Sequence, residues 1–207
     1  MGKSIASFGL VPNDLSFFDV ENQTRELLAE RSITVHEKDL NAITLFNEKQ
    51  RHAFEVISHL IYENKNRAFF VDGLGGTGKS FLYRALLADV RSKWYLALAM
   101  ITSGIATSIL PGGRIVHSRF KIPIDLSESR ECKVSKQSNL TVMIGESKLI
   151  IWNEAPMSAI EALNDLLQVL MNSSKIFGGK VVVFGGDFRQ TLPLFVEESN
   201  LRLLMLA

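Results

Sequence analysis

Short apolar runs recur along the chain, and each is followed by glycine or polar residues. They span 68–71, 94–101, 148–152 and 180–184. Continuous apolar character over such short spans is typical of parallel strands covered on both faces. Apolar residues at helical spacing between the runs predict amphipathic helices, including one over about 79–92. Alternation of strands and helices predicts an α/β domain with a parallel sheet and helices on both faces.

Two of the predicted helices begin with capping signals. Asn47 is followed three residues later by Gln50, and Ser158 by Glu161. In such a capping box the two side chains satisfy each other's backbone N–H groups. Judged alone, Gln50 is better interpreted as a capping residue than as a ligand-binding one.

The composition fits an ordinary globular domain. The 207 residues suffice for one α/β core, and residues 1–40 are weakly patterned, which predicts an N-terminal extension before a domain at 41–207. The net charge of +1 gives no bulk attraction to nucleic acid. One cysteine excludes an internal disulfide and a cysteine-based zinc site. No signal peptide or spanning segment is apparent, so we predict no membrane partner.

A glycine-rich segment follows the first apolar run and reads Gly-Leu-Gly-Gly-Thr-Gly-Lys-Ser. It matches the phosphate-binding pattern G-x-x-x-x-G-K-S, and its place between strand and helix disfavours a chance glycine-rich turn. Glycines let backbone N–H groups curl toward phosphate oxygens, and the helix start adds its positive dipole end. In this motif the lysine binds terminal phosphates and the serine ligates Mg²⁺. The candidate residues are Gly73, Gly75, Gly76, Thr77, Gly78, Lys79 and Ser80.

Polar residues follow two more of the predicted strands. Asn153 and Glu154 come after the third run, and Asp187–Gln190 after the fourth. Because the carboxyl ends of parallel strands meet at one edge, we expect both near the phosphate loop. Hydrolysis of a nucleoside triphosphate needs a group that orients water, and Glu154 is the candidate, with Gln190 as a sensor of the terminal phosphate. The alternative for Glu154 is an ordinary surface acid at a strand end.

The segment 114–121 gathers three cations, a histidine and an aromatic residue. Such a loop can neutralise phosphates and stack a base on Phe120. A solvated basic loop with Phe120 in the core is the alternative, and composition alone favours it.

The order of these motifs resembles that of the Pif-type DNA helicases of superfamily 1, especially their Helitron-transposon branch. The resemblance rests on four segments in order: Gly73–Ser80, Thr102–Ala106 with Gly112–Phe120, Leu149–Met157 and Phe177–Pro193. It implies a RecA-like P-loop domain that uses ATP and Mg²⁺ to unwind DNA with 5′-to-3′ polarity. It also implies a nuclear protein of DNA repair, recombination and telomere maintenance.

The resemblance assigns roles to individual residues. Gln50 would contact adenine, which reverses its interpretation as a capping residue alone. Lys79 and Ser80 would bind phosphates and Mg²⁺, Glu154 would be the catalytic carboxylate, and Gln190 the phosphate sensor. The residues implied to lie along single-stranded DNA are His117, Ser118, Arg119 and Phe120.

Three departures from the family pattern bear on activity. Asn153 stands where the family has an aspartate, so the metal site of Ser80 and Asn153 lacks a carboxylate. Ile115 replaces a usual threonine, and the chain ends at Ala207 without the family's second RecA-like domain. We therefore expect either a helicase motor domain with little activity alone, or a degenerate transposon-derived domain that binds nucleotide or DNA without turnover. The turn at 186–190 disfavours a small-molecule kinase.

Overall fold

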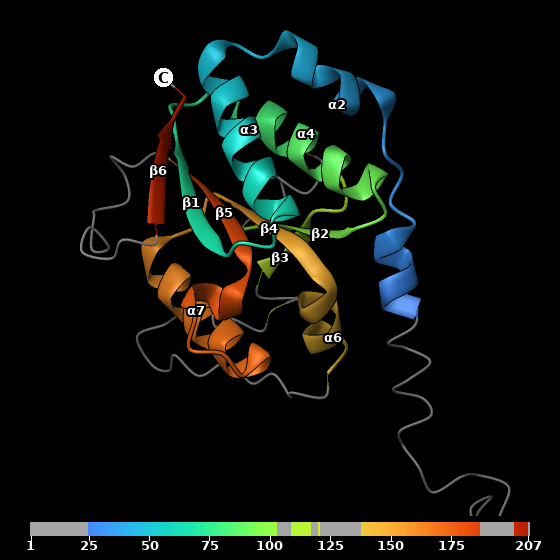
Figure 1. Cartoon of the computed structure of the whole chain (residues 1–207), viewed down its shortest axis with the longest axis vertical. Helices are drawn as coiled ribbons and strands as arrows, with labels where there is room; N and C mark the ends of the chain where they lie inside the picture. Colours follow the sequence, from blue (N-terminus) through green and yellow to red (C-terminus); the bar gives the residue numbers. More distant parts are fainter. Residues whose placement is uncertain (1–24, 103–108, 117–119, 121–137, 187–200, 207) are drawn as a thin grey trace, which may run out of the picture.

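A six-stranded, all-parallel sheet forms the centre of the molecule, with strand order β3-β2-β4-β5-β1-β6 (Figure 1). The structure is a computed structural model that describes residues 25–102, 109–116, 120, 138–186 and 201–206. The strands are β1 (Arg67–Asp72), β2 (Leu96–Ile101), β3 (Arg114–Ile115), β4 (Ser147–Asn153), β5 (Val181–Gly186) and β6 (Leu201–Met205). The predicted parallel sheet is confirmed.

The apolar runs predict the four central strands but not the two edge strands. β2 begins later than predicted, because Trp94 adopts a left-handed backbone with φ of 63° and is 83% exposed. β3 has two residues and pairs only with Met100 and Ile101 of β2. β6 adds to the free edge of β1, from Ala68 to Asp72. Short edge strands leave little periodic signal, which explains why both escaped prediction.

Helices cover both faces of the sheet (Figure 1). On one side lie α3 (Glu48–Tyr62) and α4 (Lys79–Ser92), and on the other lie α6 (Asn139–Glu146) and α7 (Met157–Met171). Alternate residues of β1 divide between the two cores: Phe69 and Val71 face the first pair of helices, Ala68 and Phe70 the second. Because both faces of the strand are buried, its residues are apolar throughout, as predicted for a sheet that is covered on both sides.

The two predicted capping boxes have different outcomes. At α3 the Gln50 N–H donates to Asn47 Oδ1 at 2.8 Å, and the Asn47 N–H donates to Gln50 Oε1 at 3.2 Å, so this box is confirmed. At α7 the predicted box was wrong: Pro156 is the capping residue, and Ser158 already lies within the first turn. Proline presets φ for a helix start and lacks the N–H that a cap would satisfy.

The predicted extension is partly a packed element. Residues 25–31 are helical, and α2 (Glu37–Asn41) and the 3₁₀ turn η2 (Ala42–Leu45) lead into α3. Asp39 accepts two hydrogen bonds from Arg84 of α4, at 2.9 and 3.1 Å, and Glu30 lies 3.6 Å from Arg91 of the same helix. Residues 25–40 thus contact the domain, although their sequence pattern is weak. Ion pairs contribute to the attachment of this segment, and ion pairs leave no hydropathy signal in the sequence.

The Asp39–Arg84 pair gives a stability prediction. We expect Asp39→Ala to lower the free energy of unfolding by about 2 kcal/mol, because it leaves a half-buried guanidinium without its carboxylate. Glu37→Ala, on the exposed side of α2, should change stability little. Urea unfolding of both variants makes the comparison. Equal stability of Asp39→Ala and Glu37→Ala would show that this segment does not hold the domain together.

Candidate functional site

The phosphate-loop motif lies at the carboxyl end of β1 and leads directly into α4. Gly76 and Gly78 both have φ of 85°, a left-handed backbone that glycine adopts without steric cost. A Cβ at Gly78 would also overlap with Nε2 of Gln50. Backbone geometry therefore favours glycine at both positions, and at Gly78 a close neighbour adds to this preference.

The start of α4 offers N–H donors to an anion. Gly78 is its capping residue and has no side chain to satisfy the first-turn N–H groups. The Thr77 hydroxyl donates to the Leu74 carbonyl at 2.9 Å and braces the loop. Lys79 Nζ donates to the carbonyl oxygens of Gly73 and, at 3.1 Å, Leu74. The lysine thus lies over the loop, with its charge at the place where phosphates would enter.

Gln50 joins α3 to the loop. Its Oε1 accepts from the Asn47 N–H at 3.2 Å, and its Nε2 donates to the Thr77 carbonyl at 3.3 Å. Only 7% of the residue is exposed. Both ends of the amide are therefore engaged within the protein, and the contact with adenine stays a prediction.

Asn153 and Glu154 occupy the end of β4. Asn153 is 5% exposed and pairs in register with Ile101 of β2 and Gly185 of β5. Glu154 is exposed and has φ of 59°, which is uncommon for a residue with a side chain. Glu154 is thus accessible to solvent at the carboxyl end of β4.

A hydroxyl from the residue after β2 fixes the backbone of Glu154. Thr102 Oγ1 donates to the Glu154 carbonyl at 2.6 Å and accepts from Trp152 Nε1 at 3.1 Å. On the other side, the Ala155 N–H donates to the Gly185 carbonyl at 3.3 Å. Sequence analysis missed Thr102 as a site residue, because its partners lie about 50 residues away along the chain.

β5 separates the loop from Glu154 and ends in two glycines. Gly186 pairs with Asp72 of β1, and Gly185 pairs with Asn153 of β4. A Cβ at Gly185 would overlap with the hydroxyl of Tyr83, which comes from the buried face of α4. Burial raises the pKa of Tyr83, so this phenol stays neutral. A tyrosine on an otherwise apolar helix face is a weak sequence signal, and Tyr83 was not predicted.

Some predicted site residues lie outside the described residues or away from the site. Gln190 and the DNA-binding candidates His117, Ser118 and Arg119 are outside the described ranges. Phe120 is described, and its ring is fully buried in the core on the α6–α7 side of the sheet. Its expected stacking on a base conflicts with this position, because burial of a large apolar ring is the favoured state.

The oxygen donors at this edge fit Mg²⁺ bound together with a nucleotide. Ser80 is the second residue of α4 and Asn153 ends β4, and neither needs a proton removed to act as a ligand. Mg²⁺ keeps several waters and takes one or two protein ligands in addition to phosphates. Within the described ranges no three His, Cys, Asp or Glu side chains gather as a metal site of their own.

The described helices give no indication of a membrane span, since none is both long and apolar enough to cross a bilayer.

Comparison with known proteins identifies the family. The model of the PIF1-like helicase family matches residues 45–206. Over 168 residues the chain is 26% identical to the ATP-dependent DNA helicase PIF1 of Candida albicans, covering 79% of this chain and 18% of that protein. It is 29% identical over 148 residues to Pif1 of Campylobacter jejuni, covering 68% and 31%.

A solved structure agrees with the fold. The crystal structure of Pif1 helicase from Bacteroides in complex with ADP-AlF3 and ssDNA has a TM-score of 0.52 and 24% identity, over 70% of this chain and 34% of that one. The chain thus spans between about a fifth and a third of its curated relatives. Since the family model covers most of the chain, the chain belongs to the PIF1-like helicase family.

Proposed function

We propose that this chain is the nucleotide-binding motor domain of an ATP-dependent DNA helicase. The observation that carries the proposal is the juxtaposition of the phosphate loop, at the end of β1, with Asn153 and Glu154, at the end of β4. Only the glycine-ended β5 lies between them. Membership in the PIF1-like family supports the same assignment.

Each candidate residue at the carboxyl ends of β1 and β4 has a proposed part in ATP binding and hydrolysis. The loop N–H groups and Lys79 hold the phosphates, and Lys79 exchanges its carbonyl partners for phosphate oxygens. Ser80 and Asn153 would hold Mg²⁺, which would neutralise charge on the phosphates. Glu154 orients the attacking water, and Thr102 keeps the glutamate backbone in place.

The relatives support a proposal that the chain acts on DNA. The Bacteroides Pif1 structure was solved with ssDNA, and the curated relatives are named ATP-dependent DNA helicases. We propose that the intact motor binds single-stranded DNA, moves with 5′-to-3′ polarity and uses a second RecA-like domain to close over ATP. A nuclear role in DNA repair and recombination is part of this proposal, although the relatives include both fungal and bacterial proteins.

Binding of a fluorescent ATP analogue, with and without Mg²⁺, tests the nucleotide site directly. Hydrolysis is then measured with and without single-stranded DNA, and polarity with partial duplexes that carry either a 5′ or a 3′ tail. We expect Mg²⁺-dependent binding of the nucleotide. Absence of such binding in folded protein would overturn the proposal.

Asn153 supports a second candidate function, which is nucleotide binding without turnover. An amide is a weaker ligand than a carboxylate for a hard cation. We expect Asn153→Asp to tighten ATP binding about tenfold when Mg²⁺ is present, because a carboxylate adds a charged ligand. Without Mg²⁺ the same change should not tighten binding, since the added charge repels phosphate.

A matched charge change controls for this effect. Asn41→Asp places the same charge on the exposed end of α2 and should leave ATP affinity unchanged. Calorimetric titrations with and without EDTA make the comparison. Equal affinity of Asn153→Asp and the parent chain in Mg²⁺ would exclude a metal-ligating role for position 153. Hydrolysis that appears only in Asn153→Asp would favour binding without turnover as the native function.

A further inference from the structure

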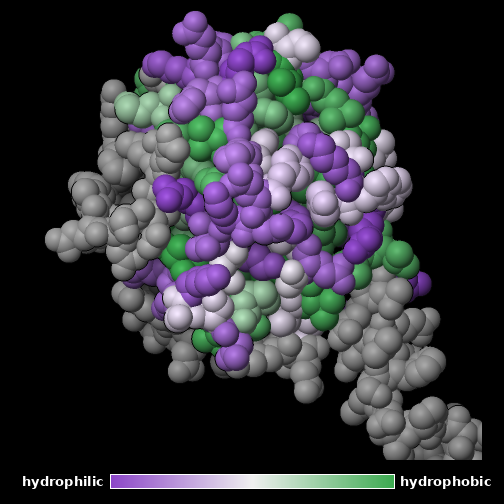
Figure 2. All heavy atoms as spheres, in the orientation of Figure 1, coloured by the Kyte–Doolittle hydropathy of each residue, from purple (hydrophilic) through white to green (hydrophobic). Residues whose placement is uncertain are grey.

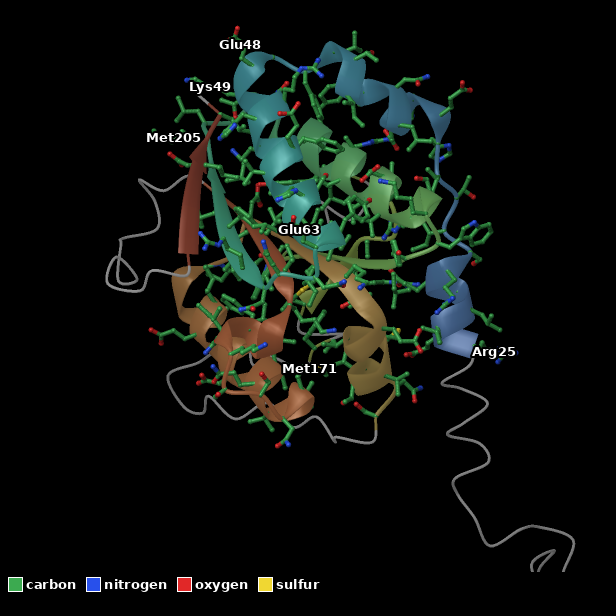
Figure 3. All side chains as sticks on the ribbon, viewed as in Figure 1. Arg25, Glu48, Lys49, Glu63, Met171 and Met205 are labelled. Carbon is green, nitrogen blue, oxygen red and sulfur yellow. The ribbon has the colours of Figure 1, made fainter. Side chains whose placement is uncertain are left out.

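A cavity of about 130 Å³ opens at the amino ends of β4 and β5. The phosphate loop lies at the opposite, carboxyl end of the strands. Its wall comes from the end of α3 and the residues after it, the end of α6, the start of β4 and the turn before β5. Glu63, at the end of α3, lies near the middle of the view in Figure 3. Figure 2 shows hydrophilic residues gathered over the middle of the face that is turned toward the viewer.

Three lysines line this cavity, and one of them, Lys65, pairs with Glu63 at 2.6 Å. The other two lie at the starts of the neighbouring strands β4 and β5. Lys148 of β4 donates to Asn64 Oδ1 and lies 5.5 Å from the centre of the Tyr95 ring. Lys180, just before β5, donates to the carbonyls of Gly145 at 2.7 Å and Ser147 at 3.2 Å. Among the described residues neither Lys148 nor Lys180 has a carboxylate partner. The cavity therefore holds two positive charges that the neighbouring side chains do not neutralise.

These charges repel each other and are partly removed from water. Burial, and secondly the charge of Lys148, lower the pKa of Lys180. A bound anion would relieve both effects, because it supplies an opposite charge to both ammonium groups.

The hydrogen-bonding groups of the wall point to the same class of ligand. The acceptors are engaged: Asn64 Oδ1 by Lys148, and two backbone carbonyls by Lys180. The carboxylate of Glu146 pairs with Arg31 at 2.8 Å. An ammonium has three donors, so each lysine keeps N–H groups for a ligand, as does the Asn64 amide. Such an excess of donors favours an anion over a cation or a neutral acceptor-poor molecule.

We propose that this cavity binds a phosphate-type oxyanion through Lys148 and Lys180, at a site separate from the phosphate loop. The volume is well below the roughly 300–1,000 Å³ of sites that enclose whole small molecules. One phosphate-sized group therefore fits, whereas a nucleotide does not. The group can come from free phosphate or from the backbone of a nucleic acid. Because the two sites lie at opposite ends of the parallel strands, both can be occupied together.

Phosphate binding by the full chain tests this proposal. The Lys79→Ala change is placed in every sample, so that the phosphate loop contributes little to the signal. Inorganic phosphate is titrated calorimetrically against a chloride background of equal ionic strength, and a short single-stranded oligonucleotide is titrated in parallel. We expect Lys148→Gln to weaken phosphate binding about tenfold, because it removes one charge-assisted contact.

Two variants control for charge and for folding. Lys148→Arg keeps the charge and should retain most of the affinity. Lys38→Gln removes an exposed charge on α2 and should have no effect. Weakening of oligonucleotide binding by Lys148→Gln would identify a nucleic-acid backbone as the source, and weakening for phosphate alone would identify a free anion. Unchanged binding of both ligands in a folded Lys148→Gln variant would overturn the proposal.

Discussion

The Lys79→Ala variant is expected to bind ATP and Mg²⁺ about 100-fold more weakly than the parent chain, because loss of one partner from a desolvated charge pair costs about 2–5 kcal/mol. In the free protein Lys79 donates to the Gly73 and Leu74 carbonyls, so part of its interaction energy is already used. The expected loss therefore lies near the lower end of that range. Equilibrium titration with a fluorescent ATP analogue measures it.

Lys93→Ala is the matched control, since Lys93 adjoins the other end of α4 and pairs with Asp89 there. It should leave nucleotide affinity within about twofold, because a surface pair contributes little. Similar affinity losses in both variants would mean that general charge, and not the loop, attracts the nucleotide. Unfolding curves for the two variants separate loss of binding from loss of structure.

Gly178→Ala is expected to lower the free energy of unfolding by about 3–5 kcal/mol, through backbone strain and a steric clash together. Gly178 lies in the 3₁₀ turn η4 (Ile176–Gly179), with φ of 61°. A Cβ there would overlap with the Leu167 carbonyl oxygen and lie 2.9 Å from its carbon. Because the obstacle is the backbone of α7, no rotamer change can relieve it.

The neighbouring glycine separates the two contributions. Gly179 has φ of 84°, but a Cβ there would meet only the Lys175 side chain, at 3.6 Å. Gly179→Ala should therefore show the cost of strain alone, about 1–2 kcal/mol. Urea unfolding of both variants gives the difference. An equal loss in the two would falsify the assignment of a packing role to the η4–α7 contact.

The central strands were predictable because burial on both faces makes them apolar throughout. β1, β4 and β5 each coincide with a predicted run to within one or two residues. The edge strands were not predictable, because β3 is held by two residue pairs and β6 by one neighbour. The segment before α3 has a weak sequence pattern for a different reason, since its attachment depends partly on arginines supplied by α4.

The site divides in a similar way between local and long-range features. The phosphate loop is local, and its glycines, lysine and serine are visible as a spacing. The brace at Glu154 needs the hydroxyl of Thr102, just after β2, and a carbonyl from β5, so it exists only after the sheet has formed. For Phe120 the sequence suggested a feature that the structure does not have. The motif predicted a ring free to stack on a base, whereas the ring is buried in the core.

The contact between α3 and the loop limits which sequences this domain can tolerate. Nε2 of Gln50 occupies the space that a side chain at position 78 would need. The same amide hydrogen-bonds to the loop at Thr77 and to the start of its own helix at Asn47. A larger residue at 78 would thus displace the Gln50 amide, and that displacement would break its hydrogen bonds. Redesign of the loop must therefore treat the two positions as a single unit.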